Sequence, residues 1–131
     1  MSVVAQSPEV STVVLEPTDE APLLARRFLS DQFAAWKIAD DYAACVVISE
    51  LVTNAYRHGE GFIVVRLFQD LDGLAVLEVW DAGEHRPMIK PQDDAALSGR
   101  GLQIISEMAK TWGVRSLNEG GKAVWAKLPV T

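Results

Sequence analysis

The stretch Ile48-Ser49-Glu50-Leu51-Val52-Thr53-Asn54-Ala55-Tyr56-Arg57-His58-Gly59 decides the fold of this chain. Two acidic residues stand before it and a glycine ends it, so we expect one helix from about Asp40 to His58. On that helix Glu50, Asn54 and His58 recur at every fourth position and form one polar line. Their neighbours are apolar, so the line should border a hydrophobic core.

The polar line permits two interpretations. Glu50 and Asn54, one turn apart, can offer oxygens to one hard cation, and Mg²⁺ typically takes one or two protein oxygens beside waters and substrate phosphates. An ordinary amphipathic helix with a solvated face produces the same pattern. The helix alone leaves both interpretations open.

A second motif follows a hydrophobic strand, in the run Val79-Trp80-Asp81-Ala82-Gly83. A carboxylate at a strand end can accept a hydrogen bond from an exocyclic amine such as adenine N6, and Gly83 would let a flat ring approach the backbone. A strand that ends in an Asx-type turn is the simpler explanation when this motif stands alone.

A third motif, Ser98-Gly99-Arg100-Gly101-Leu102, opens into an amphipathic helix expected from about Gly101 to Lys110. Free N–H groups and the helix dipole make an anion site at such a start, and Arg100 could add positive charge. The G-K-[ST] ending of a Walker A loop and the third glycine of the dinucleotide fingerprint are both missing. A plain helix start explains a lone G-x-G equally well.

The rest of the chain predicts strands at 11–15, 62–68, 74–80, 114–117 and 123–128, and a helix that Thr18 or Asp19 caps and that runs to about residue 35. This order predicts an α+β fold, a two-layer α/β sandwich whose mixed, mostly antiparallel sheet carries helices on one face. We expect a flexible arm at 1–10 and a single domain at 11–131. The long irregular stretch 84–98 should be a lid or binding loop.

Composition narrows the classes of function. A net charge of −6 without a Lys/Arg cluster argues against a direct nucleic-acid partner. Apolar runs stay far below the ~20 residues that span a bilayer, and no signal peptide is evident, so we expect a cytoplasmic protein without membrane contact. The single cysteine, Cys45, cannot form an internal disulfide, and its apolar neighbours indicate a small buried hydrophobe.

Taken together and in this order, the three motifs resemble those of the GHKL (histidine-kinase-like) ATPase superfamily, which has the Bergerat fold. The matches to its N box, G1 box and G2 box are, in turn, Glu50 and Asn54, then Asp81 and Gly83, then Gly99, Gly101 and Leu102. The resemblance covers roughly residues 11–129. The compact layout is similar to the stand-alone bacterial branch, whose best-known members are anti-sigma-factor serine/threonine kinases.

The resemblance implies ATP and Mg²⁺ as cofactors and a role for each matched residue. Glu50 would be the catalytic base, and Asn54 would bind Mg²⁺. Asp81 would bond adenine N6 in a pocket that Gly83 shapes. The segment from Gly99 to Leu102, with Arg100, would hold the phosphates beneath an ATP lid at 84–98.

The function that the resemblance implies is protein phosphorylation in transcription regulation. Such a kinase phosphorylates an antagonist protein and sequesters a sigma factor by partner switching, and relatives often form homodimers. Two alternatives remain open. The chain could be an ATP- or partner-binding module with little or no kinase activity, or a histidine-kinase-like catalytic domain that acts on a separate acceptor.

One departure from the family pattern lies in the closing strand. Many relatives carry a threonine there that supports the adenine-binding aspartate, and Ala123, after Lys122, is expected to take that place here. The loss of a hydroxyl donor should reduce adenine affinity, unless Thr53, Ser49 or a water replaces it.

Overall fold

The computed structural model describes residues 10–84 and 100–130. Its elements are β1 (Ser11–Leu15), α1 (Ala21–Ala35), α2 (Tyr42–His58), β2 (Ile63–Gln69), β3 (Ala75–Asp81), α3 (Arg100–Met108), β4 (Thr111–Ser116) and β5 (Lys122–Leu128). Each expected helix and strand is present, with its ends shifted by at most a few residues. The expected arm and lid lie outside the described residues, except for Val10 and Glu84. No helix within the described ranges has the length and apolar character needed to cross a membrane.

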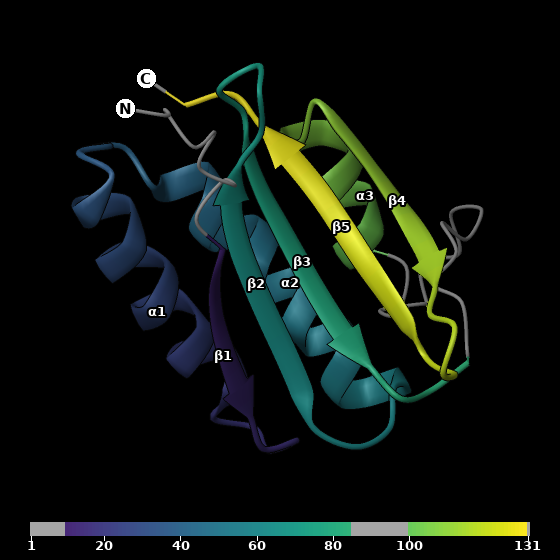
Figure 1. The fold of residues 1–131 in the computed structure, drawn as a ribbon. Helices are drawn as coiled ribbons and strands as arrows, with labels where there is room; N and C mark the ends of the chain where they lie inside the picture. The colour runs from purple at the N-terminus through teal and green to yellow at the C-terminus, as the bar shows by residue number, and fades with distance from the viewer. Residues whose placement is uncertain (1–9, 85–99, 131) are drawn as a thin grey trace, which may run out of the picture.

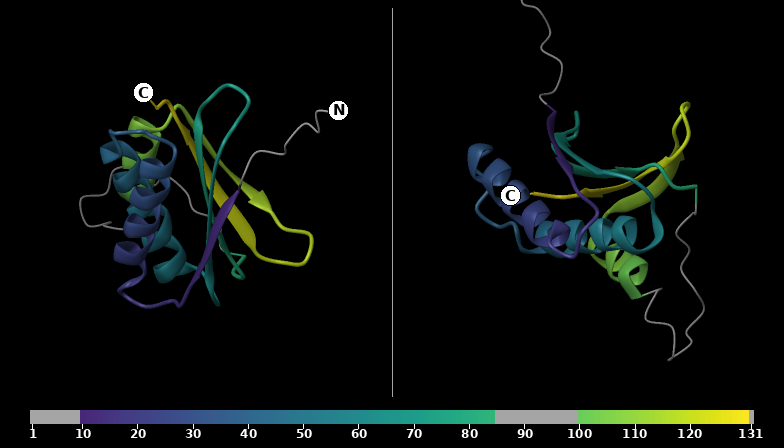
Figure 2. Two further views of the ribbon diagram at one scale, coloured as in Figure 1. Left: turned by 60° about the vertical axis from the view of Figure 1, so that its left-hand side comes forward. Right: turned by 90° about the horizontal axis from the view of Figure 1, so that it is seen from below.

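The five strands form one sheet in the order β1-β2-β3-β5-β4, and each neighbouring pair is antiparallel. All three helices cover the same face of this sheet, so the molecule has two layers (Figures 1 and 2). The predicted α+β sandwich is therefore confirmed, and the described strands contain no parallel pair. The last strand, β5, lies between β3 and β4 rather than at an edge.

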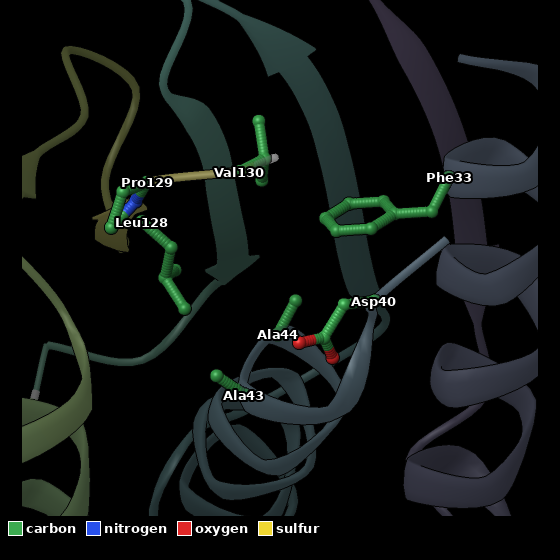
Figure 3. Close-up of a pocket in the computed structure, with 7 residues that line it drawn as sticks. All are labelled: Phe33, Asp40, Ala43, Ala44, Leu128, Pro129 and Val130. Atoms are coloured by element: carbon green, nitrogen blue, oxygen red, sulfur yellow. The ribbon is translucent and has the colours of Figure 1, made fainter. Parts of the chain in front are cut away.

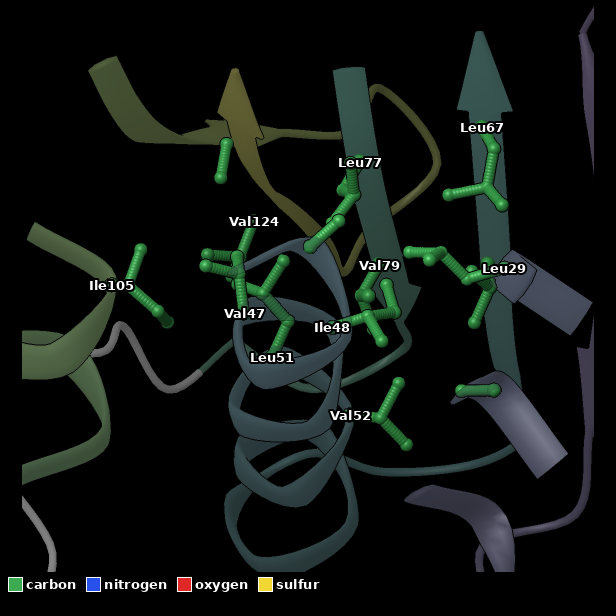
Figure 4. Packing of buried hydrophobic residues seen from close by; sticks show 14 of the residues in the cluster. Leu29, Val47, Ile48, Leu51, Val52, Leu67, Leu77, Val79, Ile105 and Val124 are labelled. Atoms are coloured by element: carbon green, nitrogen blue, oxygen red, sulfur yellow. The ribbon is translucent and has the colours of Figure 1, made fainter. Parts of the chain in front are cut away.

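The core lies between the sheet and the helices. Alternate residues of the central strands, such as Leu77 and Val79, point toward α2 and meet Ile48 and Leu51 (Figure 4). These four side chains are at most 1% exposed. Burial of one such side chain stabilises the fold by roughly 1.5–3 kcal/mol, so this layer holds α2 firmly against β3.

The helix starts differ from the expected caps. The N-cap of α1 is Glu20 rather than Thr18 or Asp19, and its side chain caps nothing. The helix α2 starts at Tyr42 rather than Asp40, because the Asp40 carboxylate accepts the Tyr42 N–H from outside the helix, at 3.1 Å. Asp41 instead accepts a hydrogen bond from Ser30 at 2.7 Å, which joins α1 to α2.

Cys45 is half-buried on α2 rather than fully buried as expected. Burial, as the largest cause, raises the pKa of its thiol, although a contact with Ser30 lowers it. A thiol with a raised pKa is a poor nucleophile at neutral pH. This agrees with the interpretation of Cys45 as a packing residue.

The face of the sheet opposite the helices carries a polar cluster around Glu78. Its carboxylate, 6% exposed, accepts from Arg66 of β2 at 3.0 Å and from Arg115 of β4 at 3.2 Å. The two guanidinium groups lie 4.9 and 5.9 Å from the ring centre of Trp80. We call Arg66, Glu78, Trp80 and Arg115 the open-face cluster.

Candidate functional site

The polar line of α2 meets the first turn of α3. A Cβ atom added to Gly101 would lie 2.6 Å from Glu50 Oε2 and 3.7 Å from Asn54 Oδ1. The absence of a side chain at Gly101 therefore lets the α3 backbone come directly against these two groups. A helix N-terminus presents unpaired N–H groups and the positive end of the dipole, so the first and third motifs together form a place for an anion.

The same place suits a magnesium ion. Glu50 and Asn54 offer a carboxylate and an amide oxygen. Asn54 Nδ2, a donor, is buried without a hydrogen-bond partner among the described residues, so it suits a phosphate oxygen rather than the ion. The described ranges contain no cluster of three His, Cys, Asp or Glu side chains that would cage a metal. Mg²⁺ prefers a few protein oxygens with waters and phosphates, so these residues fit Mg²⁺ that arrives with a nucleotide.

Asp81 ends β3 with a side chain that is only 1% exposed. Its Oδ1 accepts the Gly83 N–H at 2.7 Å, so the Asx-type turn expected as the simpler explanation is present. Its Oδ2 is buried and has no partner in the described part of the chain. A buried carboxylate oxygen without a donor is costly, which points to a donor supplied from elsewhere.

Two glycines press closely on Asp81. A Cβ on Gly59 would lie 2.5 Å from Asp81 Cγ, and one on Gly83 would lie 3.0 Å from Asp81 Oδ1. Gly59 ends α2, as expected, and has the extended backbone angles φ −94° and ψ −171°. The glycine is required because the end of α2 packs directly on the carboxylate of β3.

Lys122 is the residue that sequence reasoning missed. In the pairing of β3 with β5, Asp81 stands opposite Lys122, whereas Ala123 stands opposite Trp80. The Lys122 ammonium, with its side chain 6% exposed, donates to Asp81 Oδ1 at 2.9 Å. Successive strand residues face opposite sides, so the expectation that Ala123 takes the place beside Asp81 is wrong by one position.

The other expected residues lie as follows. Leu102 is 3% exposed and belongs to the hydrophobic core at the start of α3. Arg100 opens α3, and Gly99 lies outside the described residues. The Ser49 hydroxyl donates to the Cys45 carbonyl and accepts from Arg26, so it is already engaged away from Asp81.

The structure thus groups Glu50 and Asn54 with Gly101, and it groups Asp81 and Gly83 with Lys122.

A separate shallow pocket lies at the other end of α2, between its first turn and the end of β5 (Figure 3). Apolar side chains such as Phe33 and Val130 line it, and Asp40 is its acidic group. None of the motif residues lines it, so the pocket is not the candidate site.

Comparison with known proteins identifies the family. The family model of the histidine kinase-like ATPase domain matches residues 15–128. No curated protein is significantly similar to the chain. The crystal structure of the RsbU and RsbW domains of Rv1364c from Mycobacterium tuberculosis superposes with a TM-score of 0.70 at 21% identity, over 93% of this chain and 32% of that one. The present chain thus spans about a third of that protein's crystallised chain and shares the fold of the matched part. The family model matches most of the chain, and the first and third motifs lie against each other in the structure. The chain therefore belongs to the histidine kinase-like ATPase family.

Proposed function

We propose that this chain binds Mg-ATP and acts as a regulatory protein serine/threonine kinase of the anti-sigma-factor kind. The observation that carries the proposal is the contact of Gly101, in the first turn of α3, with Glu50 and Asn54 of α2. An acid, an amide oxygen and a helix N-terminus meet there, and such a set of groups suits phosphoryl transfer. Membership of an ATPase family supports ATP as the ligand.

The triphosphate would lie at the start of α3, where backbone N–H groups face it. Asn54 would hold Mg²⁺, with Glu50 beside it. The ion would supply positive charge that offsets the charge of the phosphates during transfer. The contribution of the protein is to position these groups and to keep its donors oriented before the reaction.

Glu50 would act as the general base. Its carboxylate would accept the proton of a serine or threonine hydroxyl on the partner while that oxygen forms a bond to the γ-phosphorus. The bond from the γ-phosphorus to the bridging oxygen breaks, and ADP leaves with that oxygen. Glu50 is half-buried and borders the core, so its carboxylate is partly shielded from solvent.

The partners would be proteins. The resemblance of the three motifs implies an antagonist protein as the substrate and a sigma factor as the sequestered partner, and the fold likeness to a structure that contains an RsbW domain agrees with this. The net charge of −6 agrees with regulation without DNA contact. A homodimer is part of the same proposal.

Calorimetry of Mg-ATP binding tests the nucleotide site. Asp81→Asn and Asn54→Ala should each weaken binding by about tenfold or more, because each removes a polar contact in a buried site. Asp72→Asn, in an exposed turn, is the matched control and should bind as the wild type does. Absence of binding at millimolar ATP would contradict the proposal.

Single-turnover transfer from labelled ATP to purified candidate antagonists tests the kinase step. Glu50→Gln should abolish transfer and leave ATP binding nearly unchanged, whereas Glu107→Gln, exposed on α3, should transfer normally. The second candidate function is a nucleotide-binding module without transfer. ATP binding without any Glu50-dependent transfer would support that module instead.

A further inference from the structure

The two oxygens of Asp81 have unequal surroundings. Oδ1 accepts the Gly83 N–H at 2.7 Å and the Lys122 ammonium at 2.9 Å. Oδ2 has no donor in the described part of the chain, although the side chain is 1% exposed. A buried oxygen without a donor costs free energy, and a ligand that offers one N–H group to Oδ2 would remove that cost.

Lys122 is equally unusual. An ammonium has three N–H donors, and its contact with Asp81 Oδ1 uses one of them. Its side chain is 6% exposed, so the remaining donors have little access to bulk water. Buried charged donors favour ligands that bring acceptors. One side of the sheet therefore presents an unpaired acceptor on Asp81 and spare donors on Lys122, next to each other.

We propose that Lys122 is a base-recognition residue that donates a hydrogen bond to adenine N1 while Asp81 Oδ2 accepts from the adenine N6 amine. Adenine carries an amino donor beside a ring-nitrogen acceptor along one edge, which is the complement of this pair. The inference rests on the proposed function. It adds to the aspartate contact implied by the resemblance a second, charged contact made by this chain's own lysine.

The register of β5 explains why a lysine can do this. Lys122 lies opposite Asp81 on the helix-facing side of the sheet, where the resemblance leads one to expect a neutral hydroxyl. A hydroxyl can either donate or accept, whereas an ammonium can only donate. A lysine in place of the hydroxyl therefore favours a ligand that has a hydrogen-bond acceptor next to its amine, as adenine has at N1.

A thermodynamic cycle in which both the ligand and the protein are varied tests the contact between Lys122 and adenine N1. Binding of ATP and of 1-deaza-ATP, in which a C–H replaces N1, is measured by calorimetry on wild type and on Lys122→Met. Wild type should prefer ATP by about tenfold or more, since a hydrogen bond to a charged donor is lost with the analogue. In Lys122→Met that preference should shrink to about twofold or less. The control ligand 7-deaza-ATP, altered on the other ring, should show the same small effect on both proteins.

The outcomes separate the two proposals. Equal affinity of wild type for ATP and 1-deaza-ATP would overturn the role of Lys122 while leaving ATP binding intact, and this result needs no variant. A preference for ATP that persists in Lys122→Met would assign N1 to another group and would also overturn it. Failure of wild type to bind either nucleotide would overturn the proposed function and this inference together.

Lys122→Met leaves Asp81 without its counter-ion, so its folding is checked by thermal unfolding. The double variant Asp81→Asn with Lys122→Met removes both charges and is the alternative background if the single variant unfolds. In that background as well, the preference for ATP over 1-deaza-ATP should be about twofold or less. A surviving preference for ATP would overturn the inference.

Discussion

Two neighbouring glycines before β5 share a backbone conformation but have very different surroundings. Gly120 and Gly121 have φ values of 93° and 88°, in the left-handed region. A Cβ on Gly120 would meet nothing within 4 Å, whereas one on Gly121 would overlap the carbonyl oxygen of Asp81 and lie 3.0 Å from Ala82 Cα. The second glycine is therefore needed for both conformation and close approach.

Alanine at each position should separate these two effects. Gly120→Ala should lower the free energy of unfolding by about 1–2 kcal/mol, the cost of a left-handed alanine. Gly121→Ala should cost at least about 3 kcal/mol, because the backbone beside Asp81 must also move. Urea denaturation of both variants measures the difference. Equal losses of unfolding free energy in the two variants would mean that the backbone at the end of β3 moves at little cost.

Gly101 has a contact of another kind, because the group that its Cβ would meet is the mobile end of Glu50. Gly101→Ala should therefore displace this carboxylate and reduce phosphoryl transfer by roughly tenfold or more. Its melting temperature should stay the same or rise, since alanine favours a helix by up to about 1 kcal/mol over glycine. Transfer kinetics and thermal unfolding are measured together, with Gln103→Ala on the same helix as the control. Normal transfer by Gly101→Ala would argue against Glu50 as the base.

At the scale of elements, the turn between β2 and β3 is held by Asp70. Its Oδ1 accepts from the N–H groups of Asp72 and Leu74 at 2.9 and 3.0 Å, and its Oδ2 lies 3.3 Å from Lys127 Nζ of β5. Desolvation raises the pKa of Asp70, but the Leu74 N–H, Lys127 and the Asp72 N–H outweigh it and lower that pKa below 3.8. The fold thus favours the charged form of the carboxylate.

This lowered pKa makes a part of the stability depend on pH. The contribution is fully present above the ordinary pKa of Asp70 and is lost as pH falls through the lowered folded value. Asp70→Asn keeps a side-chain oxygen for the turn but loses the charge, so it should be less stable than wild type at neutral pH. The difference in unfolding free energy between wild type and Asp70→Asn should become smaller below about pH 4, as urea denaturation across this range would show. A gap that does not change with pH would exclude the charge as its cause, and Asp72→Asn is the control.

The elements were predictable from the sequence where the signal is local. The spacing of the polar line on α2 and the apolar runs of β2 and β3 each depend on residues within one segment, and the helix and strands predicted from them are confirmed. The pairing of β3 with β5 was not predictable, because no hairpin joins the two strands and loop length therefore fixes no register. The misplacement of Ala123 and the omission of Lys122 both have this cause.

At the scale of the molecule, the open-face cluster links β2, β3 and β4 by ion pairs, although β5 lies between β3 and β4. Arg66 on β2 and Arg115 on β4 both reach Glu78 on β3, and Arg115 does so past Ala123 of β5. The small side chain of Ala123 leaves room for this crossing. Ala123, expected at first to replace a hydroxyl in the proposed nucleotide site, thus lies on the opposite face of the sheet.

Glu78→Gln should therefore destabilise the whole sheet. It removes the charge that both guanidinium groups share, and the loss in unfolding free energy should be on the order of 1–3 kcal/mol. The exposed Glu119→Gln should change it by less than about 0.5 kcal/mol. Chemical denaturation measures both variants. A loss as small as that of the control would show that the cluster is solvated and contributes little.

The position of β5 also has a consequence for synthesis on the ribosome. Residues 122–128 follow the rest of the sheet in the chain, yet they occupy its interior between β3 and β4. Until they emerge from the exit tunnel, β3 has an unpaired edge and Asp81 lacks the cation that neutralises it. A nascent chain that ends before Lys122 therefore exposes a strand edge that favours aggregation, and the proposed nucleotide site can form only when β5 inserts.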